Sequence, residues 1–141
     1  MNMKNNPVKH KKVIFSGNLR FPDRRSWLYQ SSRIARKTNV RFRVESLDYT
    51  SNFWKPRTQY LEKLSQATAC LNFSWKKPGF TLITFRTLDI ISSGSALLQQ
   101  EEPESMPLRD FFVPYKHYIP FQSKLELSAI FLLIRENSQL I

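Results

Sequence analysis

The stretch ACLNFSWKKPGFTLITFRTLDIISSGSALL, residues 69–98, decides the fold of this 141-residue chain. Two short apolar runs flank a longer segment with helical periodicity, which is the pattern of a strand, a helix and a second strand. Thr81 or Thr84 can cap this helix, and Gly94 suits the C′ position just after its end. The predicted strands, loop and helix are, in chain order, 69–74, 75–79, 81–93 and 95–98.

The same alternation continues on both sides of this stretch. Further strands are predicted at 13–15, 40–44 and 117–121, and further helices at 24–37, 56–66 and 124–137. Strands that alternate with helices favour an α/β fold, a Rossmann-like open and mostly parallel sheet with helices on both faces. Because ligands bind at the carboxyl ends of strands in such sheets, the loops after Phe15, Phe73 and Leu98 are the first places to seek a site.

Composition limits the class of protein. A length of 141 residues with 41% hydrophobic and 13% aromatic residues indicates one folded domain with a real core. We expect residues 1–11 to form a basic flexible arm and residues 12–141 to form the domain. The arm lacks the apolar segment of a secretory signal, and no run reaches the ~20 apolar residues of a membrane span. The single cysteine, Cys70, predicts a reducing, cytoplasmic location, and no metal site is expected from two histidines and one cysteine.

The net charge of +11 is unevenly distributed. Residues 1–66 carry fifteen Lys or Arg and four Asp or Glu, whereas residues 67–141 carry seven of each sign. Such a basic half attracts nucleic acid, an anionic membrane surface or a nucleotide diphosphate, and charge alone does not choose among them.

Several segments resemble the donor-binding half of GT-B glycosyltransferases, in particular the spore-maturation-protein-like branch of family 1. The resemblance is carried by the spacing of Arg86, Asp89 and Gly94 after the strand at 69–74. Weaker similarities lie at 14–18, 108–112, 117–118 and 125–127. The sequence departs from the family at Thr81, where a second acidic residue is common, and at Asp89, where Glu is usual.

This resemblance implies a domain that binds a nucleotide-diphosphate sugar as substrate, without a metal or another cofactor. The acceptor-binding half of such enzymes does not occur in these 141 residues. The resemblance therefore implies a fragment or a partner-dependent half, inactive as an isolated chain and completed by a separate acceptor-binding domain.

The site residues follow from the same comparison and from the chemistry of a diphosphate. Arg86 is the expected catalytic residue, since it would neutralise the departing diphosphate. Ser16, Gly17 and Asn18 form a turn whose backbone N–H groups could bind phosphate, and Asp89 could accept the ribose hydroxyls. The resemblance also implies that Arg86 and Gly94 belong to the substrate-binding set. The plainer alternatives stay open: Arg86 and Asp89 could form a surface ion pair, and Gly94 could only end a helix.

Two other functions remain open on the sequence. A nucleic-acid-binding protein would use a basic stripe on the first predicted helix and the next strand: Arg33, Arg36, Lys37, Arg41 and Arg43. A degenerate domain that folds but binds nothing is the other.

Overall fold

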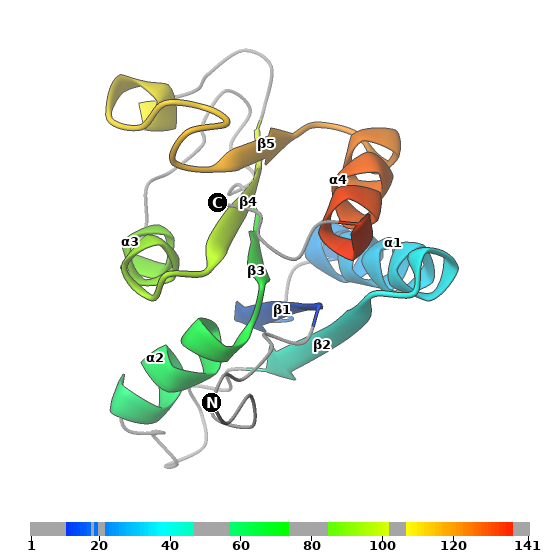
Figure 1. The fold of residues 1–141 in the computed structure, drawn as a ribbon, viewed down its shortest axis with the longest axis horizontal. Coiled ribbons are helices and arrows are strands. Elements are labelled where there is room, and N and C mark those ends of the chain that lie inside the picture. Colours follow the sequence, from blue (N-terminus) through cyan, green and yellow to red (C-terminus); the bar gives the residue numbers. More distant parts are fainter. Residues whose placement is uncertain are drawn as a thin grey trace, which may run out of the picture.

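The computed structural model describes residues 11–17, 19, 22–46, 57–73, 85–101 and 107–136. These residues form a layered α/β domain in which strands and helices alternate along the chain (Figure 1). The elements are β1 (Lys12–Gly17), α1 (Pro22–Thr38), β2 (Arg41–Ser46), α2 (Arg57–Gln66), β3 (Ala69–Asn72), α3 (Phe85–Ser92), β4 (Ala96–Gln100), the 3-10 turn η2 (Pro107–Asp110), β5 (Ile119–Phe121) and α4 (Lys124–Glu136).

The five strands form one sheet in the order β2-β1-β3-β4-β5, and every neighbouring pair is parallel. Strand β1 pairs through Val13 with Phe42 of β2 on one side and with Ala69 of β3 on the other. From β1 the chain passes to β2 at one edge of the sheet and then returns to the other side of β1 to form β3. The direction of strand addition therefore reverses between β1 and β3, which is the topological switch point. The order 2-1-3-4-5 is that of flavodoxin-like doubly wound sheets.

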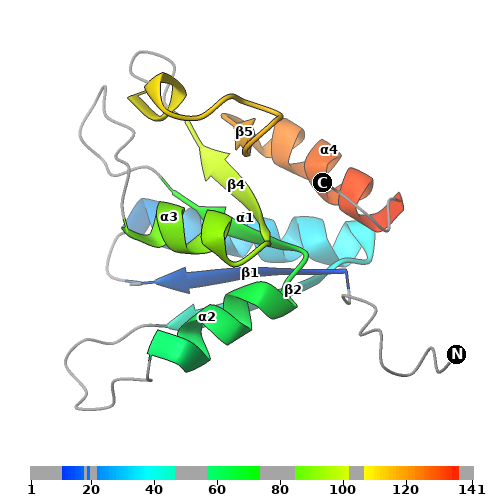
Figure 2. The ribbon, with the colours of Figure 1, turned by 60° about the vertical axis from the view of Figure 1, so that its left-hand side comes forward.

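The helices cover both faces of this sheet. Helices α1 and α4 pack together on one face, and α2 and α3 pack together on the other (Figure 1). Each helix runs antiparallel to the strands, so α1 begins beside the arrowhead of β1 and runs back to the opposite edge (Figure 2). The prediction of an open parallel α/β sheet with helices on both faces is confirmed.

Each face has its own apolar core. In β1, Val13 and Phe15 point into the cluster beneath α1 and α4, whereas Ile14 points into the cluster beneath α2 and α3. Strand β3 alternates in the same way, with Leu71 on the first face and Cys70 on the second. Strands buried on both faces are typically continuous apolar runs, which explains why 13–15 and 69–71 lack polar residues.

The helix ends show local signals that the sequence carries. Asn39 follows α1 with a φ of 58°, and Val40 N donates to Ala35 O at 3.0 Å, so the chain turns sharply into β2. Gly94 follows α3 with a φ of 81°, as its predicted C′ position requires. The Ser123 hydroxyl accepts from the backbone N of Glu126 at 3.1 Å and donates to its carboxylate at 3.2 Å, so Ser123 is the N-cap of α4.

The predicted boundaries differ from the observed ones by a few residues. Helix α1 includes Pro22, and β5 begins at Ile119 rather than at residue 117. The expected caps Thr81 and Thr84, the loop at 75–79 and the arm apart from Lys11 lie outside the described residues. No helix in the described part of the chain is long and apolar enough to cross a membrane.

Candidate anion-binding site at the carboxyl edge of the sheet

The candidate site lies where β1 and β3 end, at the switch point of the sheet. Strand β1 finishes with Ser16 and Gly17, and β3 finishes with Asn72, followed by Phe73. The helices that follow these two strands, α1 after β1 and α3 after β3, lie on opposite faces of the sheet. In open α/β sheets this divergence leaves the crevice in which ligands bind.

Two arginines from opposite faces of the sheet meet here. Arg24 lies in the first turn of α1, and Arg86 lies in the first turn of α3. The guanidinium carbon of each is 5.7 Å from the centroid of the Phe15 ring, within the range of a cation–π contact. The fold therefore brings two positive charges, 62 positions apart in the sequence, to the end of one strand.

Gly17 makes room for one of these charges. A Cβ atom on Gly17 would lie 2.8 Å from Nη2 of Arg86 and 2.8 Å from Cζ of the buried Phe15 ring. Any side chain at this position would therefore displace the guanidinium or the ring. The sequence suggested Gly17 for close approach of a phosphate, whereas the structure shows close approach of Arg86.

The two charges affect each other. Burial lowers the pKa of Arg24 from its ordinary value, and the neighbouring positive charge of Arg86 lowers it further. Arginine stays protonated in proteins at neutral pH, so both groups keep their charge. A pair of like charges in a half-buried position is stabilised when an anion binds between or beside them.

A chain of buried amides holds the start of α3 beside the strands. Asn72, at the end of β3, donates from Nδ2 to Thr87 Oγ1 at 3.1 Å and to Gln99 Oε1 at 2.8 Å. Gln99 in turn donates to the backbone carbonyl of Gln100 at 2.8 Å. Because Thr87 follows Arg86 directly, these bonds fix the helix turn that carries Arg86. Sequence reasoning missed this role, although a polar Asn at the end of an apolar strand is its signal.

The other predicted site residues are placed differently. Asp89 is only 8% exposed on α3, so it is not one half of an exposed surface ion pair. Gly94 follows the opposite end of α3 from Arg86, and no atom lies within 4 Å of a Cβ placed on it. Its position is that of a helix-ending residue. Asn18 lies outside the described residues.

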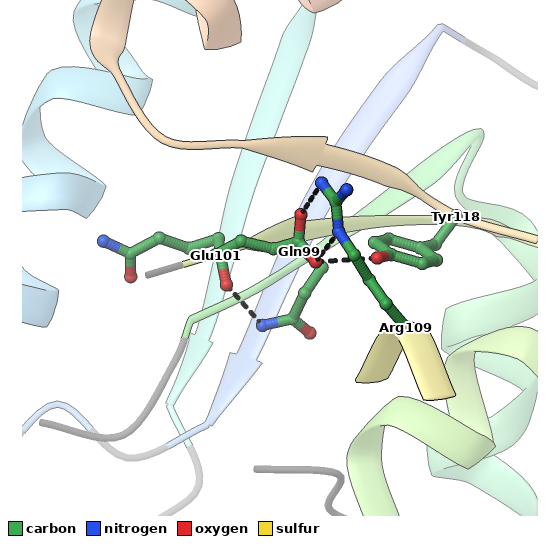
Figure 3. A network of polar contacts seen from close by, with 5 residues as sticks. Gln99, Glu101, Arg109 and Tyr118 are labelled. Carbon is green, nitrogen blue, oxygen red and sulfur yellow. Dashed lines mark hydrogen bonds and ion pairs between the residues drawn. The ribbon is translucent and has the colours of Figure 1, made fainter. Parts of the chain in front are cut away.

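A second polar cluster lies at the end of β4 (Figure 3). The buried carboxylate of Glu101 accepts two bonds from Arg109, at 2.8 Å from Nη2 and 3.3 Å from Nε, and a third from the Tyr118 hydroxyl at 2.7 Å. The hydrogen bond to Glu101 raises the pKa of Arg109, and burial raises the pKa of Tyr118. These contacts tie the segment between β4 and β5 to the sheet. Sequence reasoning assigned no role to Glu101 or Tyr118.

The last question about the site is whether the described residues could bind a metal ion. Within them no three His, Cys, Asp or Glu side chains lie close enough together to hold an ion.

Comparisons with known proteins give a limited result. No family model matches the sequence, and no curated protein matches it. Among solved structures, the chain is similar to a diflavin flavoprotein A3 from Nostoc sp., with 11% sequence identity, 92% of each chain covered and a TM-score of 0.49.

The expected relation to GT-B glycosyltransferases is corrected. No family model matches the sequence, and the observed strand order is the flavodoxin-like one. The glycosyltransferase family, the nucleotide-sugar function and the expectation that the chain uses no cofactor all rested on that resemblance and are corrected with it. The nucleic-acid alternative gains no support from these findings either. The expectation of a separate acceptor-binding partner rested on the same resemblance.

Proposed function

We propose that this chain is a flavodoxin-like domain that binds a phosphorylated mononucleotide at the carboxyl edge of its sheet. The observation that carries the proposal is the convergence of Arg24 and Arg86 over Phe15 at the β1/β3 switch point. Flavodoxin, which has this strand order, binds FMN at the same switch point, and this makes FMN the first candidate.

The residues present fit the phosphate of such a ligand. Arg24 and Arg86 supply two charges, and both belong to first turns of helices, whose N-termini favour anions. Ser16 adds a hydroxyl at the end of β1. These groups would hold a phosphate through charge-assisted hydrogen bonds, which are the stronger class of hydrogen bond.

The ring of the ligand needs a different set of residues. Phe15 and Phe73 at this edge belong to the core, where their ring centroids are 5.4 Å apart. The segments that follow β2 and β3 carry Trp54, Trp75 and Phe80 in the sequence, and we expect a stacking partner from among these three. FMN, when bound, supplies electron transfer, and the arginines of this chain hold and orient its phosphate.

The proposal includes a cytoplasmic location. Cys70, the single cysteine of the sequence, is buried, and a reduced thiol at this position suits a reducing compartment.

The test compares ligands with and without a phosphate. The wild-type protein is titrated with FMN, with riboflavin, which lacks the phosphate, and with AMP and adenosine as a second pair. We expect phosphorylated ligands to bind more tightly than their unphosphorylated partners, and the better pair identifies the base or ring. Equal affinities within both pairs would contradict the proposal.

Variants assign the effect to the arginines. Arg86→Ala is expected to weaken the phosphorylated ligand about ten- to a hundredfold and to leave its unphosphorylated partner unchanged. Arg86→Lys should recover part of the loss, because a point charge persists without the guanidinium fork. Arg33→Ala removes an exposed arginine elsewhere on α1 and serves as the control. Unchanged binding of phosphorylated ligands by Arg86→Ala would refute the assignment.

A further inference from the structure

The amino edge of the sheet, opposite the candidate site, gathers exposed positive side chains. Helices α1 and α4 end at this edge, and β1 begins there (Figure 2). The exposed cations are Lys11, Arg36, Lys37, Arg41 and Arg135, here called the basic end.

Hydrogen bonds hold parts of this group together. The backbone N of Arg41 donates to the carbonyl of Lys11 at 3.1 Å. The ammonium group of Lys11 donates to the carbonyl of Arg135 at the end of α4. The start of β1, the start of β2 and the end of α4 therefore meet at one place. This clustering turns residues distant in sequence into one charged surface.

Little negative charge balances the basic end. Glu136 is the acidic residue among the described last turns of α1 and α4 and the first residues of β1 and β2. Its Oε1 atom lies 3.9 Å from Nε of Arg135. The surface thus attracts a polyanion rather than a single small anion.

Exposed apolar side chains accompany this charge. Leu132 and Leu133 on α4 are 45% and 53% exposed, three and two positions before Arg135 at the end of the helix. Stable attachment to a bilayer generally needs two signals, and a basic patch with inserted apolar side chains is one such combination.

We propose that the basic end docks on an anionic lipid bilayer, with the cations facing the headgroups and Leu132 and Leu133 entering the interface. Nucleic acid would also be attracted by the charge. Bases, however, stack on exposed aromatic rings, and the described residues of this end expose leucines and no aromatic ring. The combination of charge and aliphatic surface favours lipid.

Vesicle cosedimentation with the whole chain tests the charge. The vesicles contain phosphatidylcholine alone or phosphatidylcholine and phosphatidylserine in equal parts. Each basic residue near an anionic surface contributes about 1 kcal/mol, so Lys37→Gln with Arg41→Gln should weaken binding to the mixed vesicles about 30-fold. The control, Lys116→Gln with Lys124→Gln, removes two exposed lysines elsewhere and should cause a much smaller loss. Equal losses in the two double variants would overturn the proposal.

A second pair of variants tests insertion. Leu133→Ser should weaken vesicle binding about fivefold, whereas Leu125→Ser should not, although Leu125 is 82% exposed at the other end of the same helix. Circular dichroism confirms that each variant is folded. A Leu133→Ser variant that binds vesicles like the wild type, together with tight binding of a DNA duplex that depends on Lys37 and Arg41, would overturn the proposal in favour of nucleic acid.

The outcome is separable from the proposed ligand site. Arg86 lies at the opposite edge of the sheet, so Arg86→Ala should leave vesicle binding unchanged. A loss of vesicle binding in this variant would contradict the proposed surface.

Discussion

Two arginine sites at the carboxyl edge of the sheet respond to burial in opposite ways. Arg109 meets the buried carboxylate of Glu101, which raises its pKa, whereas Arg24 is half-buried near Arg86, and both burial and that like charge lower its pKa. The first arrangement satisfies its charge within the protein. The second places two positive charges beside one ring, that of Phe15, where the proposed phosphate would bind. The sign of the neighbouring charge thus distinguishes the two arginine sites.

The largest expected effect is on the internally balanced site. After Arg109→Ala, the described hydrogen-bond partner that remains for the buried Glu101 carboxylate is the Tyr118 hydroxyl. We therefore expect a loss of about 2–3 kcal/mol in the free energy of unfolding. This is the low end for a broken buried pair, because the Arg109 side chain is 43% exposed and water screens part of its charge. Urea unfolding measures the loss. The double variant Arg109→Ala with Glu101→Gln should recover part of it, and no recovery would contradict this account.

A slightly smaller effect is expected at the glycine beside the like-charged pair. Gly17→Ala forces a Cβ against the buried Phe15 ring and the Arg86 guanidinium, at an expected cost of about 2 kcal/mol in stability and a weaker phosphate site. Gly94→Ala is the matched control, since its Cβ meets nothing and only the φ of 81° is unfavourable, at about 1 kcal/mol. Thermal unfolding and phosphate binding should therefore both change in Gly17→Ala, but only thermal unfolding in Gly94→Ala.

The pH dependence of stability sharpens the comparison further. The pKa of Tyr118 is raised in the folded state, so its neutral form favours folding, and that contribution is fully present below the ordinary tyrosine pKa of about 10. Stability should fall as the pH rises above this value, by about 1.4 kcal/mol at pH 11 from this group alone. Urea unfolding of the wild type and of Tyr118→Phe at pH 8 and pH 11 measures this contribution, as the change with pH in the difference between their free energies of unfolding. A difference that does not change with pH would refute the assignment.

The smallest expected effect concerns anions and stability. Sulfate should raise the unfolding free energy over chloride at equal ionic strength, by about 0.4 kcal/mol when its concentration equals its Kd. The increase should disappear in Arg86→Ala and persist in Arg109→Lys, which keeps the charge outside this site. An equal response of wild type and Arg86→Ala would argue against an anion at the switch point.

The sequence predicted the elements well because their signals are local. The apolar runs at 13–15 and 69–71 identify buried strands, and Ser123, as an N-cap residue, identifies the start of α4. Gly94 was placed at a helix end, and its φ of 81° agrees. Each of these features depends on residues within a few positions of one another, so a pattern in the chain is sufficient to find it.

The candidate site was predicted only in part. Arg86 and Gly17 were both named, but as separate contacts to a ligand, and Arg24 was not among the predicted site residues. Their contact depends on helices from opposite faces meeting over one strand, and nothing in the spacing of the residues encodes that distance. The family resemblance was wrong, since a few residues at matching spacing do not determine how the strands are ordered.

The sequence by itself determined the alternation of strands and helices, the two-sided burial of the sheet and the excess of positive charge in the first 66 residues. The tertiary structure alone decided the strand order, the pairing of Arg24 with Arg86, and the enclosure of Glu101 by Arg109 and Tyr118. The physical reason is the range of the interactions. Backbone propensity and apolar periodicity act between near neighbours, whereas charge pairing and side-chain packing act between residues that only the folded chain brings together.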